Sequence, residues 1–411
     1  MTEPVLTVAD SADAIARVAA SLSGARLLAI DVESNGLHAY RAGLCTLQIG
    51  VVTGEGDDVA SVELIDPIVA ARGGGDLLAI LAPLRAALGP TGPRKIVHDL
   101  AFDARILARH GLPLGNLFDT SLAARFLGVQ STSLAAIAHA RLGVTLSKAL
   151  QHHDWGRRPL GPELFPYLAA DVAHLPRLAR ALEAELLAKG VIPELETELD
   201  WRLRGANAAL DDDDPRPPYV RIKGAQELDP LALAVLRGLA DVREHAARKW
   251  DVPPFKVVGN DVLLQIARRR PPTASELRAT RGLDHGRGAS LVGELLAAVA
   301  RGVRDGDVPP DERLAWWTPA PPVPRELVDA RRAREHRLSS WRRAEAKRRG
   351  VDEQVVLPGH CMQELADRAP LDLAALATIG GIGQVRLERD AAAILGAIAG
   401  PVAGANAKTD G

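Results

Sequence analysis

Short apolar runs at the start of the chain and helical spacing further along divide the sequence into an α/β part and a helical part. Apolar runs at 25–31, 44–52, 62–66 and 95–98 predict four strands. The first three follow one another with short connections, so the sheet is expected to begin with antiparallel pairing. The stretch 76–88 has helical spacing, and helix-like patterns continue after the fourth strand to about residue 205. Residues 1–205 are therefore predicted to form one mixed α/β domain.

Two proline-rich stretches divide the remainder of the chain. Residues 206–225 combine an acidic run with prolines, and residues 304–327 contain several more prolines, so both are predicted to be linkers. Residues 226–303 and 328–400 share one layout of a long basic helix holding a Trp, a loop, a second helix and a final apolar helix. They are predicted to be two copies of a small helical bundle, the second more divergent. The tail 401–411 is expected to be disordered.

Composition narrows the class of protein without identifying it. A chain of 411 residues with 47% hydrophobic and 25% charged residues can bury several cores. No segment approaches the roughly 20 apolar residues that a membrane span requires, so a cytoplasmic protein without membrane contact is expected. The two cysteines, Cys45 and Cys361, are far apart, which argues against a disulfide framework and against a cysteine zinc site. Any metal is therefore expected to have oxygen ligands.

The net charge of −2 conceals one strongly basic segment. Residues 331–350 hold nine Arg or Lys and two Glu. Such a segment can contact nucleic-acid phosphates, or it can be a solvated helix face, and the sequence leaves both readings open.

Four carboxylates occur in settings that favour a shared site. Asp31 and Glu33 are two apart at the end of an apolar strand, so both side chains point to one face, although such a pair can also simply end a strand. Asp103 lies in the first turn of a predicted helix, where a carboxylate also stabilises the helix dipole. Tyr167 and Asp171 are four apart, which stacks them on one face of a helix.

If these carboxylates converge, they repel one another unless cations lie between them. A hard divalent ion such as Mg²⁺ prefers oxygen ligands, and two such ions about 3.5–4 Å apart can hold the attacking and leaving oxygens of a phosphoryl transfer. Because a phenol ionises near pH 10, Tyr167 is expected to orient a water molecule by hydrogen bonding and not to act as a base. The pattern therefore favours a metal-dependent phosphoryl-transfer enzyme.

Three segments resemble the motifs of the DEDD exonuclease superfamily. They are LLAIDVESNGLHAYRAGLCTLQIG, KIVHDLAFDARILARHGLPLGNLFDTSLAARFLG and YLAADVAHLPRL. Tyr167, four positions before Asp171, resembles the tyrosine (DEDDy) branch, whereas the histidine branch has a histidine where Pro166 stands here. The stretch SLAAIAHARLGVTLSKALQHHDWGRRPL is similar to bacterial ribonuclease D, and WDVPPFKVVGNDVLLQIARRRP makes the first helical repeat resemble an HRDC domain.

The resemblance implies a ribonuclease H-like mixed sheet flanked by helices, and a 3′-5′ exoribonuclease that releases nucleoside 5′-monophosphates. It implies two Mg²⁺ or Mn²⁺ ions held by Asp31, Glu33, Asp103 and Asp171, with Tyr167 orienting the water. It also implies, as substrates, RNA with a single-stranded 3′ end, such as tRNA precursors and other small structured RNAs, and no cofactor beyond the metal. Alternatives are a 3′-5′ exonuclease of single-stranded DNA and a catalytically inactive nucleic-acid-binding scaffold. A monomer is compatible with the sequence, which leaves the oligomeric state, the preferred metal and the physiological RNA open.

Further residues are candidates for contact with nucleic acid. They are His98, Lys148, Arg158, Arg243 and Lys256. Each has a second interpretation, as a packed histidine or as a loop or solvated charge. Phosphate contacts of this kind would be weak individually, neutral to sequence and strongly dependent on salt.

Three residues near the motifs are interpreted as structural. Asp99 and Asp119 each precede a predicted helix and are expected to be its N-cap. Trp155 is expected to lie in the core.

Overall fold

The sheet of the first domain contains the predicted strands and two short strands at its edges. The computed structural model describes residues 4–208, 216–284, 286–317 and 323–400. The strands are β1 (Val5–Ala9), β2 (Leu27–Ser34), β3 (Leu44–Val52), β4 (Ser61–Ile65), β5 (Arg94–Val97) and β6 (Leu117–Asp119), in the spatial order β1-β4-β3-β2-β5-β6. Strands β2, β3 and β4 pair antiparallel, as predicted, and the remaining pairs are parallel. The α/β fold class is therefore confirmed.

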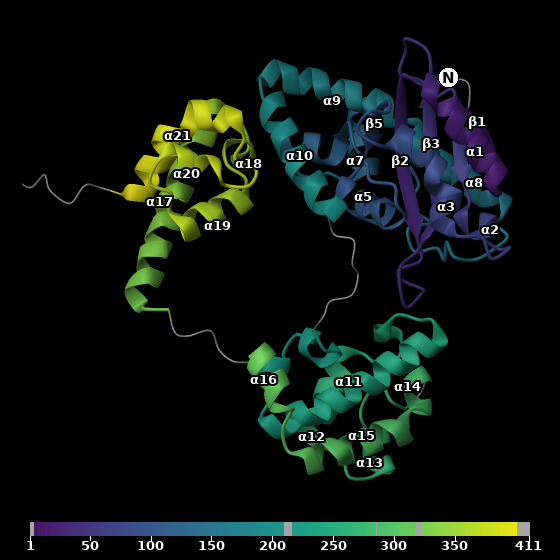
Figure 1. Ribbon diagram of the computed structural model, residues 1–411, viewed down its shortest axis with the longest axis vertical. Helices are drawn as coiled ribbons and strands as arrows, with labels where there is room; N and C mark the ends of the chain where they lie inside the picture. Colours follow the sequence, from purple (N-terminus) through teal and green to yellow (C-terminus); the bar gives the residue numbers. More distant parts are fainter. Residues whose placement is uncertain (1–3, 209–215, 285, 318–322, 401–411) are drawn as a thin grey trace, which may run out of the picture.

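Helices surround this sheet (Figure 1). They are α1 (Ala12–Ser21), α2 (Pro67–Ala70), α3 (Leu77–Leu81), α4 (Arg85–Leu88), α5 (Leu100–Arg109), α6 (Thr120–Phe126), α7 (Leu134–Leu142), α8 (Phe165–Ala173), α9 (Leu175–Lys189) and α10 (Ile192–Ala208). The predicted helix 76–88 is divided by a 3-10 turn, Ala82–Leu84, because Pro83 has no N–H for the α-helical ladder. Every residue of β3 is buried, which places this strand in the middle of the core.

The first helical domain is larger than the sequence predicts. Its helices are α11 (Pro230–Trp250), α12 (Asn260–Arg269), α13 (Ala274–Arg278), α14 (Gly286–Ser290) and α15 (Val292–Asp305). Helices α11 and α15 cross closely, since a Cβ at Gly302 would lie 2.5 Å from the Cα of Val235. Parts of both predicted linkers belong to this domain. Tyr219 is fully buried in its core, Val308 is buried too, and α16 (Pro310–Trp317) follows.

The second helical domain repeats this layout with α17 (Arg325–Arg349), α18 (Glu353–Val356), α19 (Gly359–Arg368), α20 (Leu373–Ala377) and α21 (Gln384–Ala399). Helix α17 begins inside the predicted second linker. Trp250 and Trp341 are partly buried against the cores of their domains, as expected for tryptophans within a bundle. The predicted disordered tail lies outside the described residues.

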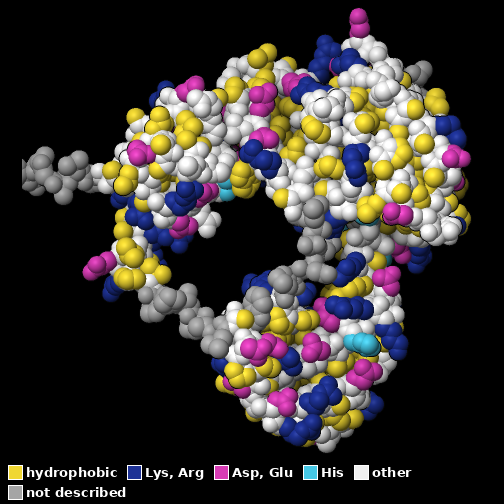
Figure 2. Space-filling view, in the orientation of Figure 1, with side chains coloured by type: hydrophobic (Ala, Val, Ile, Leu, Met, Phe, Trp, Pro, Cys, Tyr) yellow, Lys and Arg dark blue, Asp and Glu magenta, His cyan; other side chains and the backbone are white. Residues whose placement is uncertain are grey.

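Both helical domains contact the α/β domain, and the three domains lie around a central opening (Figures 1 and 2). The second helical domain binds to α10, where the fully buried Glu194 accepts hydrogen bonds from Arg349 and Arg389, each 2.7 Å long. Beside them, the rings of Trp201 and His360 stack with centroids 3.5 Å apart. The first helical domain contacts the loop between β2 and β3. None of the described helices is long and apolar enough to cross a membrane.

Candidate active site

Strand β2 presents Asp31 and Glu33 on the face that the spacing predicts. Val32 between them is 4% exposed and packs in the core, whereas both acidic side chains stay partly exposed. The antiparallel register pairs Asp31 with Gln48 of β3 and Glu33 with Thr46. An irregularity between Glu33 and Ser34 shifts this register, so regular pairing ends just after the second acid.

Helix α8 brings a third acid to these two. It packs on β2, β3 and β4, and it carries Tyr167 and Asp171. Ligand oxygens of Asp31, Glu33 and Asp171 all lie within 4.8 Å of one another. Acids from two distant stretches of the chain therefore meet in one place, which we call the acidic cluster.

Asp103 lies beside the acidic cluster but outside the group whose oxygens are within 4.8 Å. It is 4% exposed, and its Oδ2 has no hydrogen-bond partner among the described residues. Burial and the charges of Asp31, Asp119, Asp99 and Glu33 raise the pKa of Asp103 well above its usual range. A buried carboxylate oxygen without a donor is what a ligand to a cation would present.

Asp119 fixes the helix that carries Asp103. Its carboxylate accepts hydrogen bonds from the backbone N–H groups of Asp99 and Leu100, both 3.0 Å long, at the start of α5. The same carboxylate caps α6 by accepting from Ser121 and Leu122, which confirms the predicted N-cap. Asp99 stands at the N-cap position of α5, but its side chain makes no capping hydrogen bond. Asp99 therefore occupies the predicted N-cap position, but the capping hydrogen bonds come from Asp119 across the chain.

The charges of the acidic cluster oppose one another. Burial raises the pKa of Asp31 to about 7. Burial and the charge of Asp31 raise the pKa of Asp171 to about 8. Burial and the charges of Asp31 and Asp171 raise the pKa of Glu33 to about 9. A divalent cation would offset both the burial and the repulsion that cause these shifts, so the residues present fit a metal site with oxygen ligands.

Tyr167 is held beside the acidic cluster by a buried tryptophan. Trp155 is 1% exposed, as predicted, and its ring stacks on that of Tyr167 with centroids 5.8 Å apart. Burial and the charge of Asp171 raise the pKa of the Tyr167 phenol above its usual value. Tyr167 therefore stays protonated at neutral pH and can donate a hydrogen bond.

Two of the candidate RNA-binding residues differ in how accessible they are. His98 is half-buried, and its Nδ1 lies 2.8 Å from the Thr120 hydroxyl, which itself donates to the carbonyl of Val97. Burial lowers the pKa of His98. It is thus a packed, hydrogen-bonded histidine. Lys148 is exposed in the loop before Trp155 and remains a candidate for phosphate contact.

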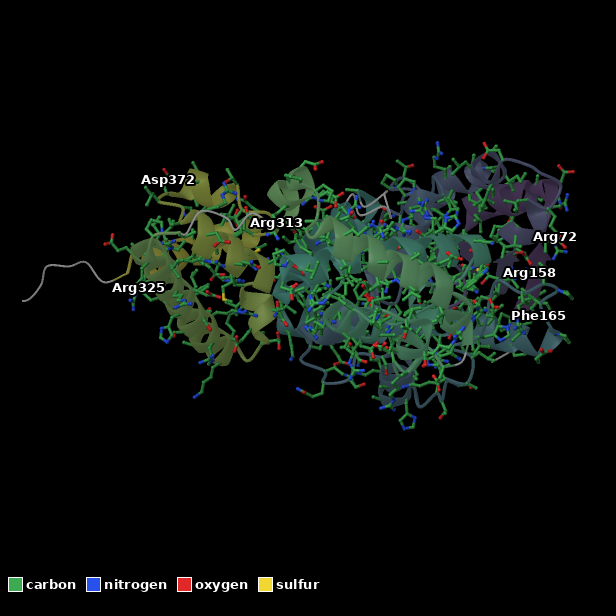
Figure 3. The ribbon with its side chains drawn as sticks, turned by 90° about the horizontal axis from the view of Figure 1, so that it is seen from below. Arg72, Arg158, Phe165, Arg313, Arg325 and Asp372 are labelled. Atoms are coloured by element: carbon green, nitrogen blue, oxygen red, sulfur yellow. The ribbon has the colours of Figure 1, made fainter. Side chains whose placement is uncertain are left out.

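The other three candidates, Arg158, Arg243 and Lys256, contact the protein itself. The Nζ of the half-buried Lys256 lies 3.4 Å from the Nδ1 of His38. Arg158, labelled in Figure 3, belongs to the nuclease domain. Its side chain is 2% exposed and donates to the Asp66 carboxylate at 2.6 Å and to the Cys45 carbonyl at 2.7 Å. Arg243 is 5% exposed and bonds the Asn260 side chain at 2.6 Å. Neither guanidinium is presented to RNA, because partners inside the protein occupy both. The ion pair of Arg158 with Asp66 was not predicted from the sequence.

The basic helix α17 likewise uses many of its charges within the protein. Residues with partners there are Arg331, Arg334, Arg337, Arg342, Arg343, Arg348 and Arg349. Their acceptors include backbone carbonyls and acids of the second helical domain, and Glu194 of α10. The segment 331–350 is therefore to a large extent structural.

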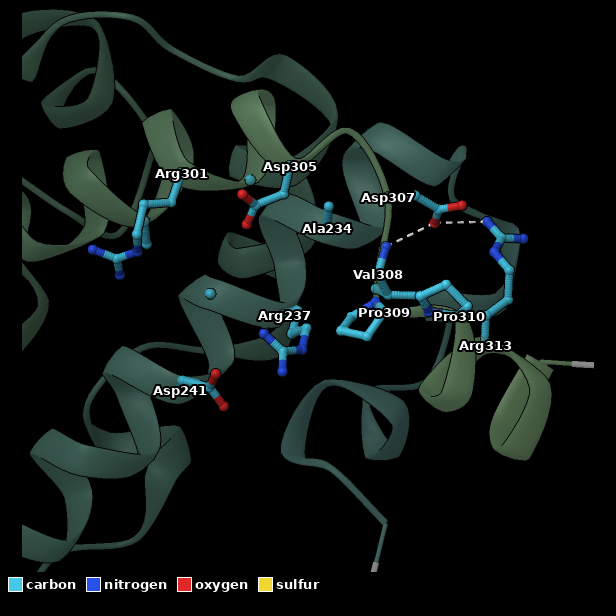
Figure 4. A pocket seen from close by; sticks show the side chains of 13 residues that line it. Ala234, Arg237, Asp241, Arg301, Asp305, Asp307, Val308, Pro309, Pro310 and Arg313 are labelled. Carbon is cyan, nitrogen blue, oxygen red and sulfur yellow. Dashed lines mark hydrogen bonds and ion pairs between the residues drawn. The ribbon is translucent and has the colours of Figure 1, made fainter.

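A cavity of about 530 Å³ lies in the first helical domain, between α11, α15 and the segment leading into α16 (Figure 4). Its lining includes Arg237, Arg301, Arg313, Asp241, Asp305 and Asp307. Arg313 pairs with Asp307, and Arg237 pairs with Glu312 nearby. The opposite charges largely cancel, and the cavity contains no residue of the acidic cluster.

Comparison with known proteins agrees with this geometry. A family model described as 3′-5′ exonuclease matches residues 6–187, and an HRDC domain model matches residues 232–299 and again 331–398. Ribonuclease D of Jannaschia sp. (strain CCS1) is 31% identical over 299 residues, which are 71% of this chain and 72% of that protein. The chain belongs to the ribonuclease D family.

Other relatives agree with this assignment. Ribonuclease D of Desulfotalea psychrophila is 34% identical over 49% of this chain and 54% of that protein. The crystal structure of Escherichia coli RNase D has a TM-score of 0.64 at 23% identity, covering 95% of this chain and 97% of that one, which shows a shared fold. This member of the ribonuclease D family is a 3′-5′ exonuclease whose two helical domains are HRDC domains.

Metal is expected to stabilise this ribonuclease D-family protein more at pH 8 than at pH 6. Because folding raises the pKa values of Asp31, Asp171 and Glu33, the folded protein without metal holds more protons than the unfolded chain between about pH 4 and pH 9. These acids therefore make folding less favourable as pH rises through that window. Metal binding requires deprotonated ligands and removes the repulsion.

Thermal unfolding with chelator and with Mg²⁺ or Mn²⁺, at each pH, measures this effect. Taking the difference in Tm between the two conditions cancels ionisations remote from the acidic cluster. A metal-induced Tm shift that is the same at both pH values would contradict the assignment of the site.

Proposed function

We propose that this chain removes nucleoside 5′-monophosphates one at a time from the 3′ end of RNA. The observation that carries the proposal is the convergence of Asp31, Glu33 and Asp171 within 4.8 Å, next to an unpartnered buried oxygen of Asp103. These four acids are the residues that would hold two Mg²⁺ or Mn²⁺ ions. When bound, such ions supply positive charge that activates water and stabilises the departing 3′ oxygen.

The side chains of the protein position the reacting groups and supply a hydrogen-bonding group. The protonated phenol of Tyr167 orients the attacking water by hydrogen bonding, and Trp155 holds its ring. The carboxylates of Asp31, Glu33, Asp103 and Asp171 would hold the ions. Nothing in this arrangement contacts a particular base, so cleavage is expected to depend little on sequence.

Small structured RNAs, including tRNA precursors, are the proposed substrates. The E. coli relative is described as an exoribonuclease involved in structured RNA processing. Lys and Arg side chains line parts of the rim of the central opening, where they can contact phosphates (Figure 2). A single-stranded end can enter a narrow site, whereas a paired stem resists it. The proposal includes a cytoplasmic location, where such RNAs are processed.

The test uses an RNA with a stem and a single-stranded 3′ tail, labelled at either end. With Mg²⁺ or Mn²⁺, the 3′ label is expected in mononucleotides at once, while the 5′-labelled strand shortens stepwise and stops at the stem. Chelator should abolish both results. Faster digestion of a matched DNA would favour a DNA exonuclease, and a 5′ label released first would overturn the polarity.

A further inference from the structure

The loop of residues 35–43 begins two residues after Glu33 and is a compact unit. The carbonyl of Asn35 accepts hydrogen bonds from the backbone N–H of His38 at 2.7 Å and of Ala39 at 2.8 Å. The side-chain oxygen of Asn35 accepts from the backbone N–H of Gly43 at 2.9 Å, which closes the loop. Ala39 is 6% exposed. A displacement of one part of this loop is therefore expected to move Asn35 and, with it, the end of β2.

The first HRDC domain contacts this loop at His38, whose Nδ1 lies 3.4 Å from the Lys256 Nζ, and more extensively at Tyr40. The Tyr40 backbone N–H donates to the Asp251 carboxylate at 3.1 Å, and Arg248 donates to the Tyr40 hydroxyl at 2.8 Å. The Arg248 guanidinium also lies 5.4 Å from the centre of the Tyr40 ring, within the range of a cation–π contact. The ring packs against the core of the HRDC domain. Tyr40 thus joins the loop to the end of α11.

The other side of the loop contacts the segment 151–158 of the nuclease domain. The Nε2 of His38 lies 3.2 Å from the carbonyl of His152. A Cβ at Gly156 would lie 3.1 Å from the Asn35 amide nitrogen, so the two segments pack closely there. Trp155, which stacks on Tyr167, belongs to the same segment. A continuous series of contacts therefore runs from the HRDC domain to the side chain beside the acidic cluster.

We propose that Tyr40 is a positioning residue, through which the first HRDC domain holds both Glu33 and Tyr167 in place for the reaction. The HRDC domain is then part of the catalytic architecture and not only a surface for RNA. The inference rests on the proposed function. It requires only the contacts of the loop, because Tyr40 is not a member of the acidic cluster.

The consequence is measurable on the shortest substrate, a dinucleotide with a single phosphodiester bond. Residues that orient the groups around a metal site typically change activity by about 10–100-fold when they are replaced. Tyr40→Ala is therefore expected to lower kcat for the dinucleotide by about that factor, with little change in KM. Tyr40→Phe keeps the ring and its packing and should lose much less.

Hydrogen exchange of the metal-free protein provides a readout that is independent of turnover. In Tyr40→Ala, backbone amides of residues 35–43 and 151–158 should exchange faster, while those of the α9 core stay unchanged. If Tyr40→Ala folds poorly, Arg248→Gln can be used in its place. It changes the HRDC side of the same contact and should have the same effect in a milder form. Lys249→Gln changes an exposed residue on the same turn of α11 and is the matched control, expected to leave dinucleotide turnover unaffected.

An unchanged kcat for the dinucleotide, with weaker binding of long RNA alone, would overturn the proposal and leave the HRDC domain as a binding module. Unchanged exchange in both segments would overturn it as well. If the wild-type protein releases no mononucleotide, the proposed function fails. The exchange experiment still decides whether Tyr40 couples the two domains.

Discussion

Replacing Asp171 with Asn is expected to lower mononucleotide release by more than about 100-fold, since replacing even outer partners of metal ligands commonly costs about 10–100-fold. The amide keeps the shape of the side chain but removes one charge from a group of acids whose oxygens lie within 4.8 Å of one another. Asp31→Asn should have the same effect, because the two acids come together at one site.

The fold should survive this change. The charge of Asp171 raises the pKa of Glu33, so its removal relieves repulsion in the metal-free protein and should not lower the Tm measured with chelator. The stabilisation by Mn²⁺ should shrink at the same time. Glu163→Gln, at an exposed acid near the start of α8, is the matched control. Near-normal release by Asp171→Asn would remove this residue from the ligand set.

Arg158→Met is expected to destabilise the protein by about 3–5 kcal/mol, the usual cost of removing one partner from a buried ion pair. The remaining Asp66 carboxylate is 5% exposed and would lose its charged partner. Urea unfolding measures the change in the free energy of unfolding. Arg157→Met is the matched control, because the Arg157 side chain is 80% exposed, and surface changes of this kind usually stay within about 0.5 kcal/mol.

A double variant separates the ion pair from simple packing. Asp66→Asn keeps the cap of α2, where the side chain accepts from the Val69 N–H at 3.0 Å, but it removes the charge. In the Arg158→Met background it should therefore restore part of the lost stability. If Arg158→Met unfolds like wild type and instead weakens RNA binding, the phosphate role suggested by the sequence would be reinstated.

Local spacing predicted each half of the acidic cluster, whereas the meeting of the two halves was implied by the resemblance of their motifs to a known family. The spacing of Asp31 and Glu33 follows from the two-residue period of a strand, and that of Tyr167 and Asp171 from the turn of a helix. The central strands were predictable for a similar reason, since they are long and apolar. Strand β6 has only three residues, and β1 is a short edge strand whose apolar run is interrupted by Thr7, so neither was recognised as a strand.

Long-range partners were not predictable in the same way. Arg158 and Asp66 are 92 positions apart, and no local pattern relates them. The sequence shows that an arginine is charged but not which group it binds. For that reason Arg158, Arg243 and much of α17 were candidates for RNA contact, although the structure shows that they have partners within the protein. The proline-rich segment near Tyr219 was predicted to be a linker for a related reason, since one buried aromatic gives no periodicity.

The two HRDC domains contact different elements of the nuclease domain. The first contacts Tyr40, and the second contacts Glu194 of α10. The two bundles match the same domain model, but each contacts the nuclease domain through its own set of residues. Loss of the C-terminal copy would therefore expose the surface of α10 around Glu194. Loss of the first copy would instead have to be compensated next to the catalytic strand.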